Sequence, residues 1–244
     1  MTFWDIIYYY GYFIGIILMV LSLIISAYCK SSFKKYSKKM SSKGITADQV
    51  ARYILDAYGV GNSVTIKPIS GSLTDNFNPK DNTVNLSESV YGNSSIAAIG
   101  VAAHECGHAI QHHVGYLPNK IRSALVPAAN IGSRGGVAIA MIGLILMGAL
   151  EYSGTEGNIG LTIAYIGIFM FSFAVLFYLV TLPVELNASH RALKILKNDQ
   201  ILVGDEMSGA RTVLTAAAMT YIAAAASAIL TLLRLISYTQ RRRS

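Results

Sequence analysis

The sequence has few charged residues and very few cysteines. Of its 244 residues, 14% are charged and only two are cysteines, Cys29 and Cys106. Two cysteines do not provide the disulfide framework on which small secreted domains depend. The low charge, together with a mean hydropathy of +0.46, is typical of an integral membrane protein.

No lysine or arginine precedes the first long apolar run, residues 6–29. This run is also too long for the core of a signal peptide, so we expect it to remain as a membrane anchor. Further apolar runs cover residues 131–150 and 159–182. A fourth run, 213–233, is rich in alanine, serine and threonine, and either crosses the membrane or lies buried within the protein. The sequence therefore predicts a mostly α-helical membrane protein with three or four transmembrane helices.

The basic residues indicate how these helices are oriented. Six lysines lie between residues 30 and 43, whereas the loop 151–158 has no basic residue and two glutamates. Because lysine and arginine favour the cytoplasmic side, we expect an outside N-terminus, a cytoplasmic segment from about residue 30 to 128, and a return to the cytoplasm at 183. The arginines at 241–243 disagree with this scheme if 213–233 crosses the membrane, so the side of the C-terminus stays open.

The lysine-rich segment is best explained by contact with anionic lipid head groups. Nucleic-acid binding is not expected, because the sequence has neither an aromatic platform nor a known nucleic-acid-binding motif. The expected partners are the lipid bilayer and a protein or peptide substrate. The oligomeric state is not indicated.

The most informative motif is His-Glu-Cys-Gly-His at residues 104–108. On an α-helix, residues four apart share one face, so His104 and His108 can bind a single Zn²⁺. Glu105 lies one step round the helix, where it can reach a metal-bound water without being a ligand. Cys106 points away from the histidine face and is expected to be a small buried residue. The same spacing arises by chance in roughly one chain in a hundred of this length. The segments around the motif therefore have to indicate whether it is a metal site.

The setting favours a metal site inside a small α+β part. A run of small apolar residues leads into the motif on the same predicted helix, with Ser94 or Ser95 as its N-cap. Earlier, a capping box at 46–49 opens another helix, and residues 64–69 and 83–87 are typical of strands. This order predicts a zincin-like arrangement, in which a strand edge near the metal binds an extended peptide.

A catalytic zinc site usually needs a third protein ligand besides the two histidines. Glu185 follows the third apolar run directly, and the loop charges place it on the same membrane side as His104 and His108. Pro183 is expected to begin a new helix, on which Ser189 shares the face of Glu185. The alternative is that Glu185 is simply an acidic residue favouring a helix N-terminus.

With these segments the sequence resembles the YugP-type membrane zinc metallopeptidases of bacteria, and more distantly the HtpX-like and prenyl-protein membrane proteases. The matching segments are 73–79, 85–87, 102–111, 182–189 and 216–221. The resemblance implies metal ligands at His104, His108 and Glu185 and a catalytic glutamate at Glu105. It also implies a multi-pass protein of the bacterial cell membrane.

The sequence departs from the family pattern beside these core segments. Asn76, Phe77 and Asn78 stand where histidine, tyrosine and aspartate are expected, and His190 stands where arginine is more usual. The departures leave the ligands intact but give no support to a substrate-contact role for residues 75–78.

The sequence therefore predicts a zinc metalloendopeptidase with its active site on the cytoplasmic side. A zinc-activated water would hydrolyse the peptide bond, with Glu105 as general base. The expected domains are an anchor at 1–29, a zincin-like part at 30–128 that holds the histidine motif, and a helical membrane part at 129–244 that carries Glu185.

Other roles remain possible at this point. One alternative is a non-proteolytic membrane scaffold or chaperone with a structural or vestigial zinc site. A transporter is disfavoured, because the apolar runs hold few ionisable residues and show no repeat. Candidates for an oxyanion donor are Tyr221, Arg211 and His190.

Overall fold

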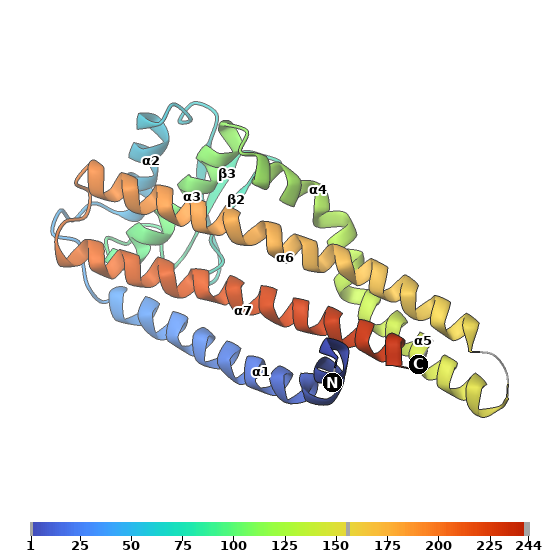
Figure 1. Ribbon diagram of the computed structural model, residues 1–244. Coiled ribbons are helices and arrows are strands. Elements are labelled where there is room, and N and C mark those ends of the chain that lie inside the picture. Colours follow the sequence, from blue (N-terminus) through green and yellow to red (C-terminus); the bar gives the residue numbers. More distant parts are fainter. Residues whose placement is uncertain (1, 155–156, 242–244) are drawn as a thin grey trace. The chain divides into compact units, whose positions relative to one another are not determined.

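The computed structural model describes residues 2–154 and 157–241, and this part of the chain is mostly helical (Figure 1). Its contacts divide the chain into two compact units. The helical unit contains Met1–Leu23, Ile121–Leu182 and Tyr221–Ser244. The mixed unit contains Ile24–Lys120 and Pro183–Thr220.

Four helical stretches of the described chain are long and apolar enough to cross a membrane. They are α1 (Phe3–Tyr36), the stretch formed by α4 (Leu117–Ile131), the π-helical turn η1 (Gly132–Gly136) and α5 (Val137–Tyr152), then α6 (Asn158–Asn198) and α7 (Asp205–Arg241). The alanine-rich run 213–233 therefore lies within the fourth such helix. By length and composition, the described part of the chain has four candidate membrane spans.

Small residues let α5 and α6 pack backbone to backbone within the helical unit. A Cβ atom added at Gly143 would collide with the backbone of Ala164, and one added at Gly160 would collide with the backbone of Met147. Such contacts are typical of membrane helices, where close van der Waals packing replaces the hydrophobic effect as the cause of association.

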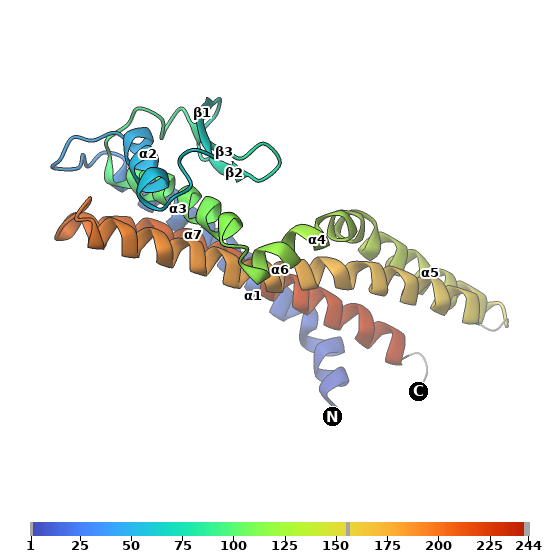
Figure 2. The same cartoon turned by 90° about the horizontal axis from the view of Figure 1, so that it is seen from above.

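The mixed unit contains a sheet of three short strands, β1 (Thr65–Ile69), β2 (Asn76–Asn78) and β3 (Thr83–Ser87), in the order β1-β3-β2. β1 pairs with β3 in parallel, and β2 pairs with β3 antiparallel (Figure 2). The sequence indicated β1 and β3 but not β2, because three residues with asparagine at both ends show no apolar alternation. β2 is an edge strand of the sheet.

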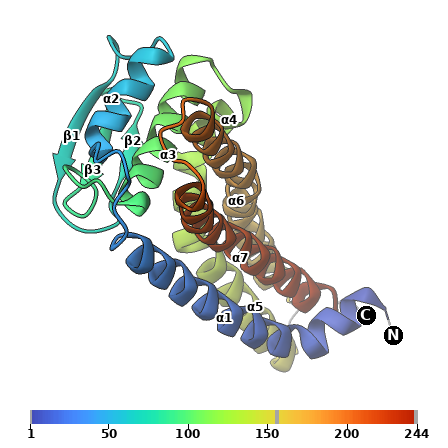
Figure 3. The same ribbon diagram turned by 90° about the vertical axis from the view of Figure 1, so that its left-hand side faces the viewer.

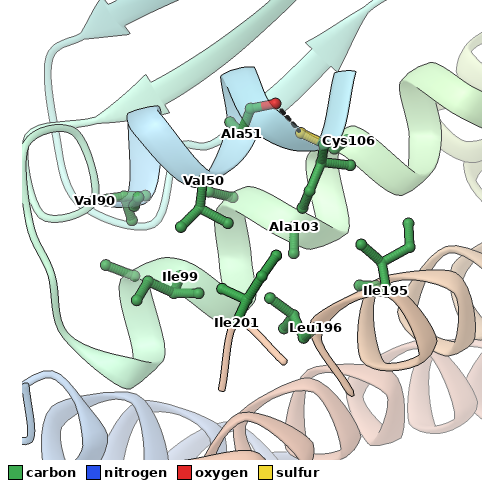
Figure 4. Packing of buried hydrophobic residues seen from close by; sticks show 14 of the residues in the cluster. Val50, Ala51, Val90, Ile99, Ala103, Cys106, Ile195, Leu196 and Ile201 are labelled. Carbon is green, nitrogen blue, oxygen red and sulfur yellow. Dashed lines mark hydrogen bonds between the residues drawn. The ribbon is translucent and has the colours of Figure 1, made fainter. Parts of the chain in front are cut away.

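The core of the mixed unit forms where α2 (Ala47–Ala57) packs against α3 (Ile96–His113), as Figures 3 and 4 show. α2 buries Val50, Ile54 and Leu55 on one face. The helix ends at Ala57, and Tyr58, which follows it, is 41% exposed.

Both predicted helix starts are supported by capping hydrogen bonds. The backbone N–H of Ala98 donates to Ser95 Oγ over 3.3 Å, so Ser95 rather than Ser94 is the N-cap of α3. At α2, the backbone N–H of Thr46 donates to Gln49 Oε1 over 3.1 Å. These bonds satisfy backbone donors that a helix start otherwise leaves without partners.

The expectation that Pro183 begins a new helix is wrong. α6 runs without a break from Asn158 to Asn198 and contains Pro183 in its interior. A proline inside a helix cannot donate to the carbonyl four residues earlier, at a cost of about 3 kcal/mol. The helix continues because the residues around the proline are firmly packed, with Val184 fully buried. Glu185 therefore lies inside a helix and not at its N-terminus.

Candidate metal centre

The candidate site lies where α3 meets the part of α6 that belongs to the mixed unit (Figure 3). Gly107 makes this approach possible. A Cβ atom added there would lie 2.7 Å from the carbonyl oxygen of Ala188 and 3.3 Å from its Cα. Since no side chain separates the helices at this point, Glu185, one turn before Ala188, lies against the histidine face of α3.

His104, His108 and Glu185 converge on one point. The Nε2 atoms of the two histidines are 3.1 Å apart, and Glu185 Oε2 lies 3.2 Å from that of His104 and 3.4 Å from that of His108. Tetrahedral zinc, with bonds of about 2.0–2.1 Å, places two ligand atoms about 3.3 Å apart. The observed triangle therefore fits a zinc ion bound by two imidazoles and a carboxylate, with a fourth position left for water.

The three converging side chains are also shielded from solvent, as the side chains of a metal site are. The exposed fraction of the side chain is 14% for His104, 9% for His108 and 6% for Glu185. A buried carboxylate needs a compensating positive charge, since its transfer from water to a protein interior is costly. A divalent cation between the three side chains would provide that charge.

Gln111 fixes the protonation of His108. Its amide Nε2 donates to the carbonyl oxygen of Val184 over 2.8 Å and to Asn187 Oδ1 over 3.0 Å. The amide therefore turns its Oε1 towards His108 Nδ1, 3.0 Å away. Because Oε1 only accepts, Nδ1 must carry the proton, and the lone pair of Nε2 is left to face the point where the three side chains converge.

Two further contacts extend the support around the ligands. Ser189 Oγ lies 3.1 Å from His104 Nδ1, so the serine indicated by sequence as a supporting residue contacts one of the three candidate ligands. Arg191 Nε donates to Asn187 Oδ1 over 2.8 Å, which holds the partner of Gln111 in place. No pattern in the sequence indicated Asn187 or Arg191 as supporting residues, and Gln111 was not predicted either. Gln111 lies three residues after His108. This spacing could have indicated that the two side chains meet, because residues three apart share a helix face.

Glu105 lies beside the ligands and is 8% exposed. Burial raises its pKa to about 7; the neighbouring His104 lowers that pKa, Glu185 and Asp75 raise it, and a backbone hydrogen bond from Phe77 lowers it. Phe77 belongs to β2, so Glu105 lies between the metal ligands and the edge strand of the sheet. A carboxyl group that titrates near neutral pH suits proton transfer.

Cys106 occupies the opposite side of α3, as expected. Its Sγ donates to the backbone carbonyl of Ala51 on α2 over 3.6 Å (Figure 4). Burial raises the pKa of its thiol, because the thiolate would lose its hydration. Cys106 is thus a packing residue of the core.

Two of the suggested oxyanion donors lie elsewhere on the mixed unit. His190 and Arg211 line a pocket of about 480 Å³ together with Lys194 and Lys197, and none of the three ligand side chains lines it. Tyr221 belongs to the helical unit. These positions give no support to an oxyanion role for His190 or Arg211.

The comparisons with known proteins agree with this geometry. Residues 11–240 match the family described as "Putative neutral zinc metallopeptidase". The chain is also 41% identical over 225 residues to "Putative membrane protease YugP" of Bacillus subtilis (strain 168), covering 92% of this chain and 94% of that protein. The chain belongs to this family. No solved structure matches it.

The family membership confirms the resemblance drawn from the sequence motifs. The family description and the name of the relative indicate a zinc peptidase of membranes, in agreement with the four apolar helices and the cluster of two histidines and a glutamate.

Proposed function

We propose that the protein is a membrane zinc metalloendopeptidase with His104, His108 and Glu185 as metal ligands and Glu105 as general base. One observation carries this proposal. The ligand atoms of the three residues form a triangle with edges of 3.1 to 3.4 Å, which matches the edge of a zinc tetrahedron. Glu105 follows His104 directly in the sequence motif and is buried like His108 and Glu185.

The reaction is hydrolysis of a peptide bond. Zinc bound at this site would polarise the scissile carbonyl and lower the pKa of water towards about 7. Glu105 accepts the proton of the attacking water while the new carbon–oxygen bond forms. It then delivers the proton to the amide nitrogen as the carbon–nitrogen bond breaks. Gln111 and Ser189 hold the imidazoles in the orientation that this chemistry requires.

The position of β2 favours a zincin-like arrangement with a defined substrate strand. β2 forms one edge of the sheet, and its Phe77 donates a backbone hydrogen bond to Glu105. An N–H that reaches Glu105 points away from β3, so this edge of β2 faces α3. We propose that an extended peptide binds along this edge through the backbone groups that Glu105 does not occupy, which brings its scissile bond towards Glu105.

We further propose that the site lies on the cytoplasmic side of the membrane. The support is the charge pattern, in which six lysines follow the first apolar run and Arg191, Lys194 and Lys197 follow the third. The site residues belong to the mixed unit, which contains both of these basic stretches.

The test uses detergent-purified protein, added zinc and a disordered reporter protein. Glu105→Gln should keep one zinc per chain but lose cleavage by about 10²- to 10⁴-fold, the usual contribution of a general base. His108→Ala should lose the stoichiometric zinc. Glu88→Gln is the matched control, because Glu88 is exposed and lies outside the site. Wild-type cleavage by Glu105→Gln would refute the general-base role.

A scaffold or chaperone with a structural zinc site is the second candidate. This function would use the same three metal ligands, but the protein would not cleave peptide bonds. We would favour this function over proteolysis if the wild-type protein held one zinc per chain and yet cleaved no disordered reporter. Adding a chelator would then leave the amount of intact reporter unchanged.

A further inference from the structure

A pocket of about 510 Å³ lies between α1 and α7 in the helical unit. Figures 1 and 3 show these two helices side by side. Apolar side chains, hydroxyl groups and one arginine line the pocket, and those used below are Gly15, Ile16, Met19, Leu230 and Arg234. A cationic side chain in such surroundings needs an explanation, because charged residues within candidate membrane helices are rare and usually functional.

Within the described residues, Arg234 has little to neutralise its charge. Its Nη2 donates to the hydroxyl of Tyr238 over 3.2 Å, and its guanidinium carbon lies 5.9 Å from the ring centroid of Tyr12. Its Nε is buried without a hydrogen-bond acceptor in that part of the chain, and no carboxylate there forms an ion pair with it. A guanidinium has five N–H donors, so the pocket offers an anion several of them.

Two glycines of α1 make room for this arginine. A Cβ atom added at Gly11 would lie 3.0 Å from Arg234 Cγ, and one added at Gly15 would lie 3.5 Å from Arg234 Nη1. The spacing of four places both glycines on one face of α1. In membrane helices this spacing usually permits close contact of two backbones. Here the two glycines leave space beside α1 for the side chain of Arg234, which also lines the pocket.

The residues around Arg234 favour a position near the lipid head groups. It directly follows the apolar run 213–233 of α7. Tyrosines collect at the same end of both helices, and the rings of Tyr8 and Tyr238 meet edge to face at 5.6 Å. Such an aromatic belt marks the boundary between hydrocarbon and head groups.

The three aliphatic hydroxyl groups of the pocket already have acceptors within their own helices. The hydroxyls of Ser22, Ser227 and Thr231 each donate to a backbone carbonyl of their own helix, over 2.7, 2.9 and 2.8 Å. Anion binding therefore falls to the guanidinium, whose planar fork of donors matches the oxygen atoms of a phosphate group.

We propose that this pocket is a binding site for an anionic phospholipid. The phosphate of the lipid pairs with Arg234, and an acyl chain lies on the apolar wall formed by Gly15, Ile16, Met19 and Leu230. The proposal is independent of the peptidase site, since all of its residues belong to the helical unit.

The test is native mass spectrometry of delipidated protein titrated with phosphatidylglycerol, or with phosphatidylcholine of the same chain length. We expect one phosphatidylglycerol per chain, retained at least ten times better than phosphatidylcholine. Arg234→Gln should lose this preference, and Arg234→Lys should retain part of it because the charge remains. Arg211→Gln is the charge-matched control, because Arg211 lies on α7 but in the mixed unit.

A second pair of variants tests the shape of the pocket without removing the arginine. Gly15→Ala should bind lipid normally, because its Cβ would be in ordinary contact with Arg234 Nη1 at 3.5 Å and Leu230 Cδ2 at 3.8 Å. Gly15→Leu should fill the pocket and reduce retention at least tenfold. If Arg234→Gln does not fold, as judged by helicity and monodispersity, the difference in lipid retention between Gly15→Ala and Gly15→Leu tests the proposal.

Three outcomes would overturn the proposal. The first is equal retention of both lipids by the wild-type protein. The second is unchanged retention in a folded Arg234→Gln or in Gly15→Leu. The third is displacement of the lipid by an equal concentration of inorganic phosphate, which would assign the guanidinium to free phosphate.

Discussion

Gly107 and Ala188 bring their helices into direct backbone contact, because a Cβ atom on Gly107 would lie 2.7 Å from the Ala188 carbonyl oxygen. Real Cβ atoms do not approach a carbonyl oxygen this closely, so any side chain at residue 107 must push α6 away from α3. The contact lies one residue from His108 and one turn from Glu185. Assembly of the metal site therefore depends on the absence of one methyl group.

Gly107→Ala should lower zinc affinity at least tenfold, because α6 must move and Glu185 moves with it. Gly100→Ala on the same helix is the matched control, since its Cβ would lie 3.6 Å from the Cβ of Ala210, an ordinary contact. Alanine is also the better helix former by about 1 kcal/mol, so Gly100→Ala should be neutral or stabilising. Metal analysis after dialysis against a weak chelator measures the difference. Equal zinc content in both variants would contradict the packing argument.

Gln111→Met should weaken zinc binding by about 10- to 100-fold, the usual effect of losing the partner of a ligand histidine. The reason is that His108 Nδ1 loses the acceptor that keeps its proton there. Gln111→Glu keeps an acceptor for His108 Nδ1, although it loses the donor to Val184 and Asn187, and should bind zinc more tightly than Gln111→Met, which loses both groups. Competition with a fluorescent zinc chelator gives both affinities. If the two variants bind zinc equally, the hydrogen bond to Gln111 does not fix the tautomer of His108.

Cys106→Ala should keep both zinc and cleavage activity, because the thiol packs against α2 and does not reach the metal. In a Cys29→Ala background, the remaining Cys106 should not react with a maleimide until the protein is denatured, since burial raises the pKa of its thiol. The measurement is the mass increase after labelling with and without denaturant. Loss of zinc in Cys106→Ala would instead identify the thiol as a ligand.

The membrane side of the site can be tested by labelling single cysteines in whole cells. With both native cysteines replaced by alanine, Lys80→Cys in the exposed turn after β2 should react with a membrane-impermeant maleimide only after lysis. Ser153→Cys, in the loop between α5 and α6, should react in intact cells. The opposite pattern would place the metal site outside the cytoplasm.

The sequence predicted the elements whose side chains follow a clear period. β3 coincides with the predicted strand at 83–87, and the four apolar runs lie within the four long helices. The spacing of His104 and His108 needed only the geometry of one helix, so their shared face was predictable. The placement of Glu185 beside them also followed, from charge and ligand chemistry.

The features that were missed depend on packing between elements. β2 is too short for a pattern and owes its conformation to pairing with β3. Pro183 carries a local signal for a helix start, but the packing of Val184 and its neighbours overrides that signal. Gln111 acts only because α6 presents Val184 and Asn187 to it, and no spacing along the sequence reports such a contact.

Because of the backbone contact at Gly107, the zinc content of the purified protein should report whether α3 and α6 have kept their packing. Helicity measured by circular dichroism would hardly change if α3 and α6 separated by the width of a methyl group, since both helices would remain wound. The two edges that join Glu185 to the histidines, 3.2 and 3.4 Å, would already be too long for one zinc ion. Detergents chosen for retained metal rather than retained helix content should therefore yield the better samples for structure determination.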